Sequence, residues 1–220
     1  MTQNGFHTSP GTVPLEAGRP LLITDADEVL LRFVEGFIRF LEARRLRLDL
    51  SSYRLHGNVL RQDDGTPLID IEVTALLDEF RSDLDSLDAV AHAREALAGL
   101  RASVQTVVLS NVTSAQAEPR TRNLAALGFD FPLLVNSGPK GPAVRALAQR
   151  AGSPAFFVDD IPMHLDSAAA AAPEVYRIHL IGDERLKPLL PPAPAAHLHA
   201  QDWRAAAAFI RARLPAPPSR

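Results

Sequence analysis

The sequence predicts an α/β fold in which a central parallel sheet is flanked by helices, and three observations lead to this prediction. Residues 21–24 form an apolar run without polar–apolar alternation, which is typical of a strand buried on both faces. From residue 104 onward, strand-like and helix-like segments alternate, as in a parallel sheet covered by helices. Carboxylates directly follow two of the strand-like runs, and the carboxyl edge of a parallel sheet is where ligands bind.

Length and composition set the broad class of the protein. The 220 residues suffice for one sizeable core, with room for a small additional domain. The net charge is −3 and no strongly basic block occurs, so nothing indicates nucleic-acid binding. Cysteine is absent, which excludes disulfides and thiolate chemistry. No apolar run has the length of a membrane span and the N-terminus lacks a signal-peptide pattern, so we expect a cytoplasmic protein without a membrane partner. The oligomeric state does not follow from the sequence.

The first half of the chain contains a leader, one strand and several helices. Glycine and proline are frequent in residues 1–19, which we expect to be a flexible leader outside the core. After the strand at 21–24, apolar residues at three- and four-residue steps predict a helix over 30–46. Loops are expected over 48–69, with a hairpin turn at Asp64-Gly65. Helices are predicted over 70–80 and 88–100, the second with Asp88 as its N-cap.

The second half repeats a strand–loop–helix pattern. The predicted strands cover residues 104–109, 131–135, 155–158 and 175–181. The predicted helices cover residues 114–127, 141–151, an alanine-rich segment that ends at Pro173, and 202–214. A proline-rich connector spans 188–194. This alternation is the second reason for expecting parallel strands joined by helices.

The residues after the first strand carry the first chemical signal. Asp25 and Asp27 lie two positions apart, so their side chains point the same way if the backbone stays extended. Two like charges aimed at one point are costly unless a cation or a shared proton lies between them. The pattern therefore indicates a divalent-metal site or an acid–base pair. The alternative is a strand that ends in a solvated acidic turn.

Further polar groups occur where other predicted strands end. Ser110 follows the strand at 104–109, Asp159 and Asp160 follow the strand at 155–158, and Lys140 opens the helix at 141–151. The carboxyl ends of parallel strands lie at one edge of a sheet, so these groups can converge with Asp25. A carboxylate can attack phosphorus, Mg²⁺ prefers carboxylate and phosphate oxygens, and a hydroxyl and an ammonium can hold the transferred group. The set is suited to phosphoryl transfer.

On these residues the chain resembles the haloacid dehalogenase-like (HAD) hydrolase superfamily. Leu21–Val29 is similar to the Asp-x-Asp-x-Thr/Val signature of its first motif, and Val107–Ser110 is similar to the second motif, with Ser110 where many relatives have Thr. Lys140 matches the third motif and Phe156–Asp160 the acidic fourth. The resemblance implies a Rossmann-like core with a central parallel sheet, and Mg²⁺ as the cofactor.

The resemblance also implies roles for the residues of the first three motifs. Asp25 would be the nucleophile and a ligand of Mg²⁺. Asp27 would protonate the leaving group and then activate water, and its backbone carbonyl would complete part of the metal shell. Ser110 and the backbone N–H groups near Asn111 would bind the phosphoryl group. Lys140 would fix Asp25 and offset the excess negative charge around the phosphate.

The fourth motif would complete the metal site. Asp160 matches the direct metal ligand, and Asp159 matches an outer-shell ligand or a partner of Lys140. His164 stands where many relatives carry a further Asp. Relatives with an Asp-Asp fourth motif often lack that residue, so we interpret His164 as structural rather than as a ligand.

A long segment separates the first and second motifs. It contains roughly seventy residues more than a bare connection requires, at the point where this superfamily inserts its type-one (C1) cap. The resemblance implies a mostly helical cap over 33–98, a catalytic core over 20–32 and 99–214, and a C-terminal tail over 215–220. A cap excludes water and contacts the substrate. Its candidate contact residues, each more often an ordinary surface residue, are Arg54, His56, Asn58 and Arg61.

The expected function is that of a Mg²⁺-dependent phosphatase acting on a small phosphorylated metabolite through an aspartyl-phosphate. One alternative is a 2-haloacid dehalogenase of the same fold, which needs the aspartate nucleophile but no metal and no acid–base group, so that Asp27 argues against it. A second alternative is a non-catalytic HAD-like protein that binds phosphate or a partner, and the intact motif set argues against it. The sequence does not indicate which phosphorylated metabolite is the substrate.

Overall fold

A parallel sheet forms the centre of the molecule, which the computed structural model describes over residues 5–82, 84 and 86–215. Within this part of the chain the sheet has seven strands in the order β1-β6-β5-β2-β7-β8-β9, and each neighbouring pair is parallel. The strands are β1 (Phe6–His7), β2 (Leu21–Thr24), β5 (Gln105–Ser110), β6 (Leu133–Val135), β7 (Ala155–Asp159), β8 (Tyr176–Leu180) and β9 (Leu198–Ala200). The predicted α/β fold with a central parallel sheet is confirmed.

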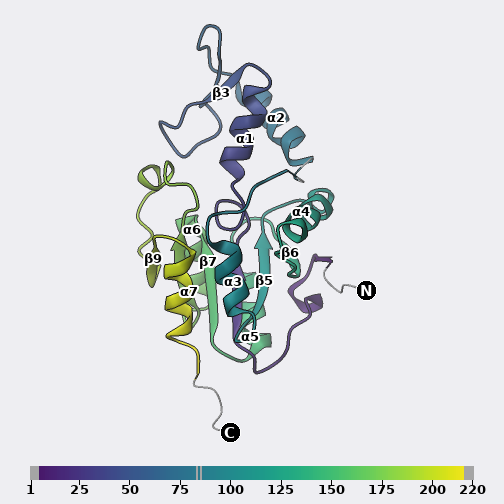
Figure 1. Cartoon of the computed structure of the whole chain (residues 1–220), viewed down its shortest axis with the longest axis vertical. Coiled ribbons are helices and arrows are strands. Elements are labelled where there is room, and N and C mark those ends of the chain that lie inside the picture. The colour runs from purple at the N-terminus through teal and green to yellow at the C-terminus, as the bar shows by residue number, and fades with distance from the viewer. Residues whose placement is uncertain (1–4, 83, 85, 216–220) are drawn as a thin grey trace.

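Helices cover both faces of this sheet (Figure 1). They are α3 (Ala93–Leu100), α4 (Ser114–Ala126), α5 (Gly141–Ala151), α6 (Pro162–Ala171) and α7 (Trp203–Arg211). Strand β2 is buried on both sides, because Leu22 packs in the cluster that contains residues of α3, α4 and α7, whereas Leu21 and Ile23 pack in the cluster that contains residues of α5 and α6. All three side chains are fully buried. The segment 21–24 is therefore a central strand buried on both faces, as its sequence predicts.

The N-terminal segment differs from the expected flexible leader. Phe6–His7 forms β1 and pairs with β6, with Phe6 opposite Leu133. Val13 is buried in the core, and its carbonyl oxygen accepts a hydrogen bond from the Arg150 guanidinium at 2.9 Å. The same guanidinium donates to the Pro10 carbonyl. A two-residue strand carries no periodic signal, so pairing with the sheet edge decided this structure. Residues 1–4 of the expected leader lie outside the described residues, as do residues 216–220 of the expected tail.

A second, smaller unit is inserted between β2 and β5 and lies at one end of the molecule (Figure 1). It contains α1 (Phe33–Glu42), β3 (Leu46–Leu48), β4 (Val59–Arg61) and α2 (Asp70–Ser82). We call residues 33–82 the insert. The antiparallel β3–β4 pair was not predicted, because both strands are only three residues long. The expected turn at Asp64-Gly65 is present: Gly65 has a φ of 71°, and the Arg61 N–H donates to the Thr66 carbonyl at 2.9 Å.

Aromatic side chains join the two helices of the insert. The ring of Phe80 on α2 lies 5.2 Å from Phe33 and 5.3 Å from both Phe37 and Phe40 on α1, measured between ring centroids. Gly36 lies among them, and a Cβ there would come within 2.3 Å of Leu87. These ring contacts join α1 to α2, and the buried apolar residues of the insert belong to the same cluster as Leu22 and Val108 of the sheet domain.

Two neighbouring backbone segments connect the insert with the sheet domain. The Arg32 N–H donates to the Asp88 carbonyl, and the Val90 N–H donates to the Leu30 carbonyl, at 2.9 and 2.8 Å. The entering and leaving chains therefore run side by side in a single connection. Helix α3 follows this connection and packs against α7. Because the expected boundary at residue 98 would divide α3, we propose that the insert ends before this helix.

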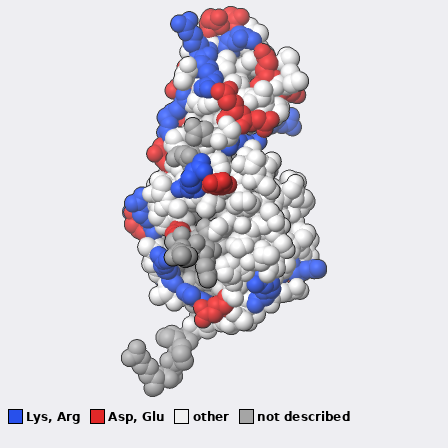
Figure 2. Space-filling model, turned by 90° about the vertical axis from the view of Figure 1, so that its right-hand side faces the viewer, with Lys and Arg blue, Asp and Glu red and all other residues white. Residues whose placement is uncertain are grey.

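Charged side chains are unevenly distributed over the surface. Figure 2 shows side chains of both charge signs interspersed on the insert, and a largely uncharged face on the sheet domain below it. Among the described residues, no helix combines the length and the apolar character that crossing a membrane requires.

Candidate active site

The site forms where the central strands end. Strand β2 lies between β5 and β7, in a register that pairs Thr24 with both Val108 and Val158. Asp25 directly follows β2, and its N–H donates to the Val158 carbonyl at 2.9 Å. Ser110 is the last residue of β5, and Asp159 ends β7. The parallel register therefore brings residues that are far apart in the sequence to one edge of the sheet.

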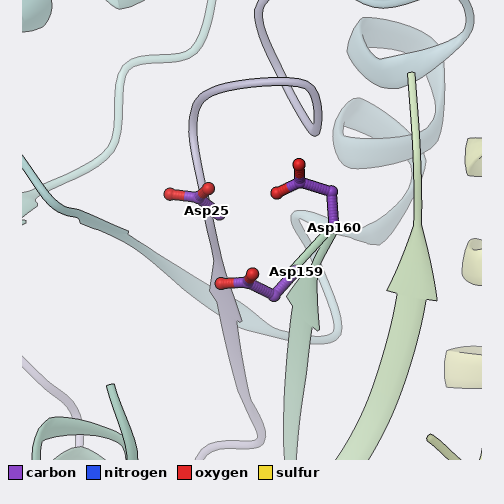
Figure 3. Close-up of side chains that lie close together, drawn as sticks. All are labelled: Asp25, Asp159 and Asp160. Carbon is purple, nitrogen blue, oxygen red and sulfur yellow. The ribbon is translucent and has the colours of Figure 1, made fainter. Parts of the chain in front are cut away.

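Three carboxylates converge at this edge. Asp25, Asp159 and Asp160 each offer one oxygen, and these oxygens all lie within 4.8 Å of one another. Figure 3 shows the three side chains reaching from the ends of β2 and β7 toward a common space. All three residues are buried. The structure thus brings together three of the four aspartates expected at the metal.

Lys140 is the cation within this carboxylate group. Its ammonium Nζ lies 2.6 Å from Asp25 Oδ1 and 2.8 Å from Asp159 Oδ2, and the side chain is 1% exposed. The following residue, Gly141, starts α5, and its N–H donates to Ser167 Oγ at 3.0 Å. A Cβ at Gly141 would lie 2.2 Å from the Ser167 carbonyl oxygen. This close approach of α5 to α6, which only glycine permits, fixes the position of Lys140.

Burial and mutual repulsion shape the charges of the site. Burial raises the pKa of Asp25 to about 6, with Lys140 acting in the opposite direction. Burial also raises the pKa values of Asp159 and Asp160. Burial by itself lowers the pKa of Lys140, but the adjacent Asp159 and Asp25 outweigh it and raise the pKa. One ammonium faces three carboxylates, so the site has an excess of negative charge that a bound cation would relieve.

Asp27 lies apart from the three clustered carboxylates. Its Oδ1 accepts a hydrogen bond from Arg120 Nη1 at 2.5 Å, so the two residues form an ion pair. The side chain of Asp27 is 30% exposed and that of Arg120 is 0% exposed. Arg120 comes from α4, and its Nε and Nη2 have no hydrogen-bond partner among the described residues. Sequence reasoning missed Arg120, because nothing in the pattern of α4 separates a buried arginine from the exposed ones nearby. Its position after Pro119, inside a helix, is the sole local irregularity that marks this turn.

The expected phosphate-binding residues line the same space. The Ser110 hydroxyl is buried and has no hydrogen-bond partner among the described residues. Asn111 bridges two loops: its Nδ2 donates to the Gly138 carbonyl at 3.0 Å, and its Oδ1 accepts from Asn136 at 2.7 Å. The buried, unpaired hydroxyl is a polar group that a bound oxyanion would satisfy.

His164 does not belong to the carboxylate cluster. It lies on α6, is 7% exposed and borders the space over the carboxylates, and its Nδ1 has no hydrogen-bond partner among the described residues. Burial, together with the nearby Lys140 charge, lowers its pKa to about 4, so the imidazole is neutral at physiological pH. Its Nε2 lies 3.5 Å from Asn111 Nδ2.

A cavity of about 250 Å³ lies over the carboxylates, between the sheet domain and the insert. The sheet domain contributes the site residues to its lining, and the insert contributes mainly apolar side chains, including Phe33, Leu48 and Leu50. Among the candidate contacts of the insert, Arg54 lines this cavity. Within the described part of the chain, His56 instead bonds Thr74 at 3.0 Å and Arg61 bonds Glu72 at 3.2 Å.

Tyr53 is a second site residue that sequence reasoning missed. It lies in the loop between β3 and β4 and lines the cavity. Its hydroxyl donates a hydrogen bond to Asp160 Oδ2 at 2.5 Å. The sequence places it beside Arg54, in the least regular part of the insert, where no periodic pattern indicates which side chain points inward.

Comparison with known proteins identifies the fold. No protein-family model matches the sequence, and no match among curated proteins was found. A HAD-superfamily hydrolase of subfamily IA, variant 1, from Geobacter sulfurreducens has a similar structure, with 20% sequence identity, a TM-score of 0.59, and coverage of 90% of this chain and 100% of that chain. A putative β-phosphoglucomutase from Thermotoga maritima aligns at 16% identity and a TM-score of 0.54, covering 89% of this chain and 100% of that chain.

A third similar structure represents the other chemistry that the resemblance suggested. An L-2-haloacid dehalogenase aligns at 14% identity and a TM-score of 0.57, covering 88% of this chain and 100% of that chain. The similarity thus extends along nearly the whole of each compared protein, although the three proteins are named for different reactions. The chain has the fold of the haloacid dehalogenase-like hydrolases.

Proposed function

We propose that the protein is a Mg²⁺-dependent phosphatase that hydrolyses small phosphomonoesters through a phosphorylated Asp25. The observation that supports this most directly is the buried set of Asp25, Asp159 and Asp160 around Lys140, at the end of the central strand. The excess of carboxylates suits a divalent cation, and the ammonium suits the oxygens of a transferred phosphoryl group.

Asp25 is the nucleophile in this proposal. Lys140 holds its Oδ1 at 2.6 Å, and no described residue bonds Oδ2, which is therefore the oxygen that attacks phosphorus. As the bond from Oδ2 to phosphorus forms, the bond between phosphorus and the leaving alcohol oxygen breaks. The hydroxyl of Ser110 and the ammonium of Lys140 bind the phosphoryl oxygens during this transfer.

Asp27 transfers the protons. In its protonated form it gives a proton to the leaving oxygen, and the resulting carboxylate then takes a proton from the water that attacks the phosphorylated Asp25, releasing phosphate. Arg120 bonds Oδ1 of Asp27, which leaves Oδ2 for proton transfer. Asp27 also lines the cavity, so the residue borders the space that a substrate would occupy.

The residues present fit Mg²⁺. The available ligands are hard carboxylate oxygens, which Mg²⁺ prefers. Both oxygens of Asp159 are engaged, one by Lys140 and the other by the Ile161 N–H at 2.9 Å. Tyr53, in contrast, bonds only one oxygen of Asp160, so Asp160 would hold the ion directly and Asp159 would act through Lys140. Asp25 would hold the ion through Oδ1, because one carboxylate oxygen can accept from an ammonium and bind a cation at the same time. When bound, Mg²⁺ would neutralise charge on the phosphoryl oxygens.

The size of the cavity supports a small substrate. A volume of about 250 Å³ accommodates a phosphorylated metabolite but not a loop of a folded protein. We therefore expect turnover of small phosphate esters and little activity on an intact phosphoprotein. A screen of phosphorylated metabolites with purified protein and Mg²⁺ would identify the substrate class.

The test of the reaction uses an aryl phosphate with an acidic phenol, with and without Mg²⁺. Hydrolysis should require Mg²⁺ and disappear in chelator, and Asp25→Asn should abolish it. Full activity in excess chelator would contradict the proposal. Incubation with a 2-haloacid under the same conditions tests the dehalogenase alternative, for which halide release should not depend on the metal.

A leaving-group comparison tests the role of Asp27. General acid–base catalysis contributes about 10²–10⁴-fold, so Asp27→Asn should lose about this factor on an alkyl phosphate. The loss should shrink on the activated aryl phosphate, whose phenolate needs no proton. Asp25→Asn should show no such difference. An equal loss on both esters, with phosphorylation of Asp25 limiting the rate, would exclude Asp27 as the general acid.

A further inference from the structure

The bond between Tyr53 and Asp160 joins the insert to the proposed metal site. Tyr53 belongs to the loop between β3 and β4, and Asp160 follows β7, 107 residues later. The hydroxyl oxygen lies 2.5 Å from Asp160 Oδ2, within the range of a charge-assisted O–H···O⁻ hydrogen bond. A side chain of the insert therefore contacts a carboxylate that, in the proposed function, binds the cation.

The loop around Tyr53 is built to hold this side chain in place. The two hydrogens of the Asn58 side-chain amide are shared among three acceptors: the carbonyl of Ser52 at 3.2 Å, the hydroxyl of Ser52 at 2.8 Å, and the carbonyl of Arg54 at 2.7 Å. These bonds fix the residues on both sides of Tyr53. The Asn58 amide thus holds the backbone on both sides of Tyr53, so the loop that presents the tyrosine to Asp160 is itself restrained.

The other partner is also fixed, except for one oxygen. Asp160 is 2% exposed, and its backbone carbonyl oxygen lies 2.9 Å from His179 Nε2. Tyr53 bonds Oδ2, and no described residue bonds Oδ1. The hydrogen bond thus holds one oxygen of a carboxylate that lies beside Asp25 and leaves the other oxygen without a partner among the described residues. Partners of this kind, which orient a ligand without touching the metal, commonly set metal affinity.

We propose that Tyr53 is a positioning residue that couples the closed position of the insert to metal binding, by fixing the Asp160 carboxylate for the cation. This inference rests on the proposed function. The two chain segments that enter and leave the insert are bonded to each other at Arg32 and Asp88, so a displacement of the insert about them would separate Tyr53 from Asp160. When the insert lies over the site, Asp160 is held, and when it moves away, Asp160 loses this partner.

The coupling must act in both directions. If the closed insert raises the affinity for Mg²⁺ by some factor, then bound Mg²⁺ must favour the closed insert by the same factor. Loss of a hydrogen bond to a metal-binding carboxylate typically lowers metal affinity about 10–100-fold. We expect about tenfold for Tyr53, because Asp160 keeps its covalent position at the end of β7 without it.

The experiment measures Mg²⁺ binding by calorimetry, without substrate, for the wild type, Tyr53→Phe and Tyr176→Phe. Tyr176 is the other tyrosine of the chain and lies in β8, stacked on Phe156 and away from the cavity lining. Tyr53→Phe should bind Mg²⁺ about tenfold more weakly, and Tyr176→Phe should bind like the wild type. Asn58→Ala leaves the Tyr53 hydroxyl in place but removes the bonds that restrain its loop, so it should also weaken Mg²⁺ binding.

Hydrogen exchange of residues 49–58 supplies the second measurement. Saturating Mg²⁺ should slow amide exchange in this loop in the wild type, and it should do so much less in Tyr53→Phe. Equal Mg²⁺ affinity in the wild type and Tyr53→Phe would overturn the inference, while the proposed function would stand. Tighter binding in Tyr53→Phe would also overturn it, because the tyrosine would then compete with the ion. Absence of Mg²⁺ binding by the wild type would overturn both proposals.

Discussion

The ion pair between Asp27 and Arg120 leads to a prediction about stability. Asp27→Asn keeps the shape of the side chain but removes the charge that compensates a guanidinium with 0% exposure. Removing one partner of a buried ion pair costs about 3–5 kcal/mol. Asp27 itself is 30% exposed, which allows some screening, so we expect the lower end, about 3 kcal/mol. For a chain of this length the melting temperature should fall by about 6–12 °C.

The assay is urea unfolding, followed by the fluorescence of the single, fully buried Trp203. The double variant Asp27→Asn/Arg120→Met should recover most of the lost stability, because no charge is then buried without a partner. Glu79→Gln is the control: it breaks an exposed pair with Arg44 at 2.6 Å and should change the free energy of unfolding by less than about 0.5 kcal/mol. If the double variant is no more stable than Asp27→Asn alone, burial of an unpaired guanidinium is not the cause.

Two further predictions concern single residues. Gly141→Ala should destabilise the protein by about 1–3 kcal/mol and lower its activity, because the added Cβ would lie 2.2 Å from the Ser167 carbonyl oxygen and displace Lys140. Thermal unfolding measures the loss of stability and kcat measures the loss of activity. An unchanged melting temperature would contradict this prediction. Glu28 is buried with its pKa raised from 4.5 to about 7 by desolvation, so its ionisation costs stability increasingly as the pH rises through this window. Glu28→Gln should therefore unfold at a higher temperature than the wild type at pH 8 but not at pH 4, and a pH-independent difference would refute this account.

The sequence was sufficient to predict the sheet and the residues at its edge. The run at 21–24 lacks polar–apolar alternation, which is typical of a strand that is buried on both faces. Asp25, Ser110 and Asp159 lie at or directly after the ends of strands, so parallel pairing alone brings them together. Lys140 was expected at the same edge, and its two ion pairs with Asp25 and Asp159 are present. The shared sheet edge follows from local patterns and one topological rule, whereas the pairing of Lys140 with these carboxylates was implied by the resemblance to the HAD superfamily.

Tertiary structure alone decided two further partners of the site carboxylates, Arg120 and Tyr53, and the N-terminal edge of the sheet. Arg120 meets Asp27 across 93 residues, and Tyr53 meets Asp160 across 107, and neither pair has a signal in local periodicity. The two-residue strand β1 exists because β6 offers it an edge to pair with. Such contacts depend on how whole helices and loops pack, and a side chain of α4 or of the insert points into the site only after that packing is set. The sequence thus determined which chemical groups gather at the sheet edge, and the fold determined what holds them there.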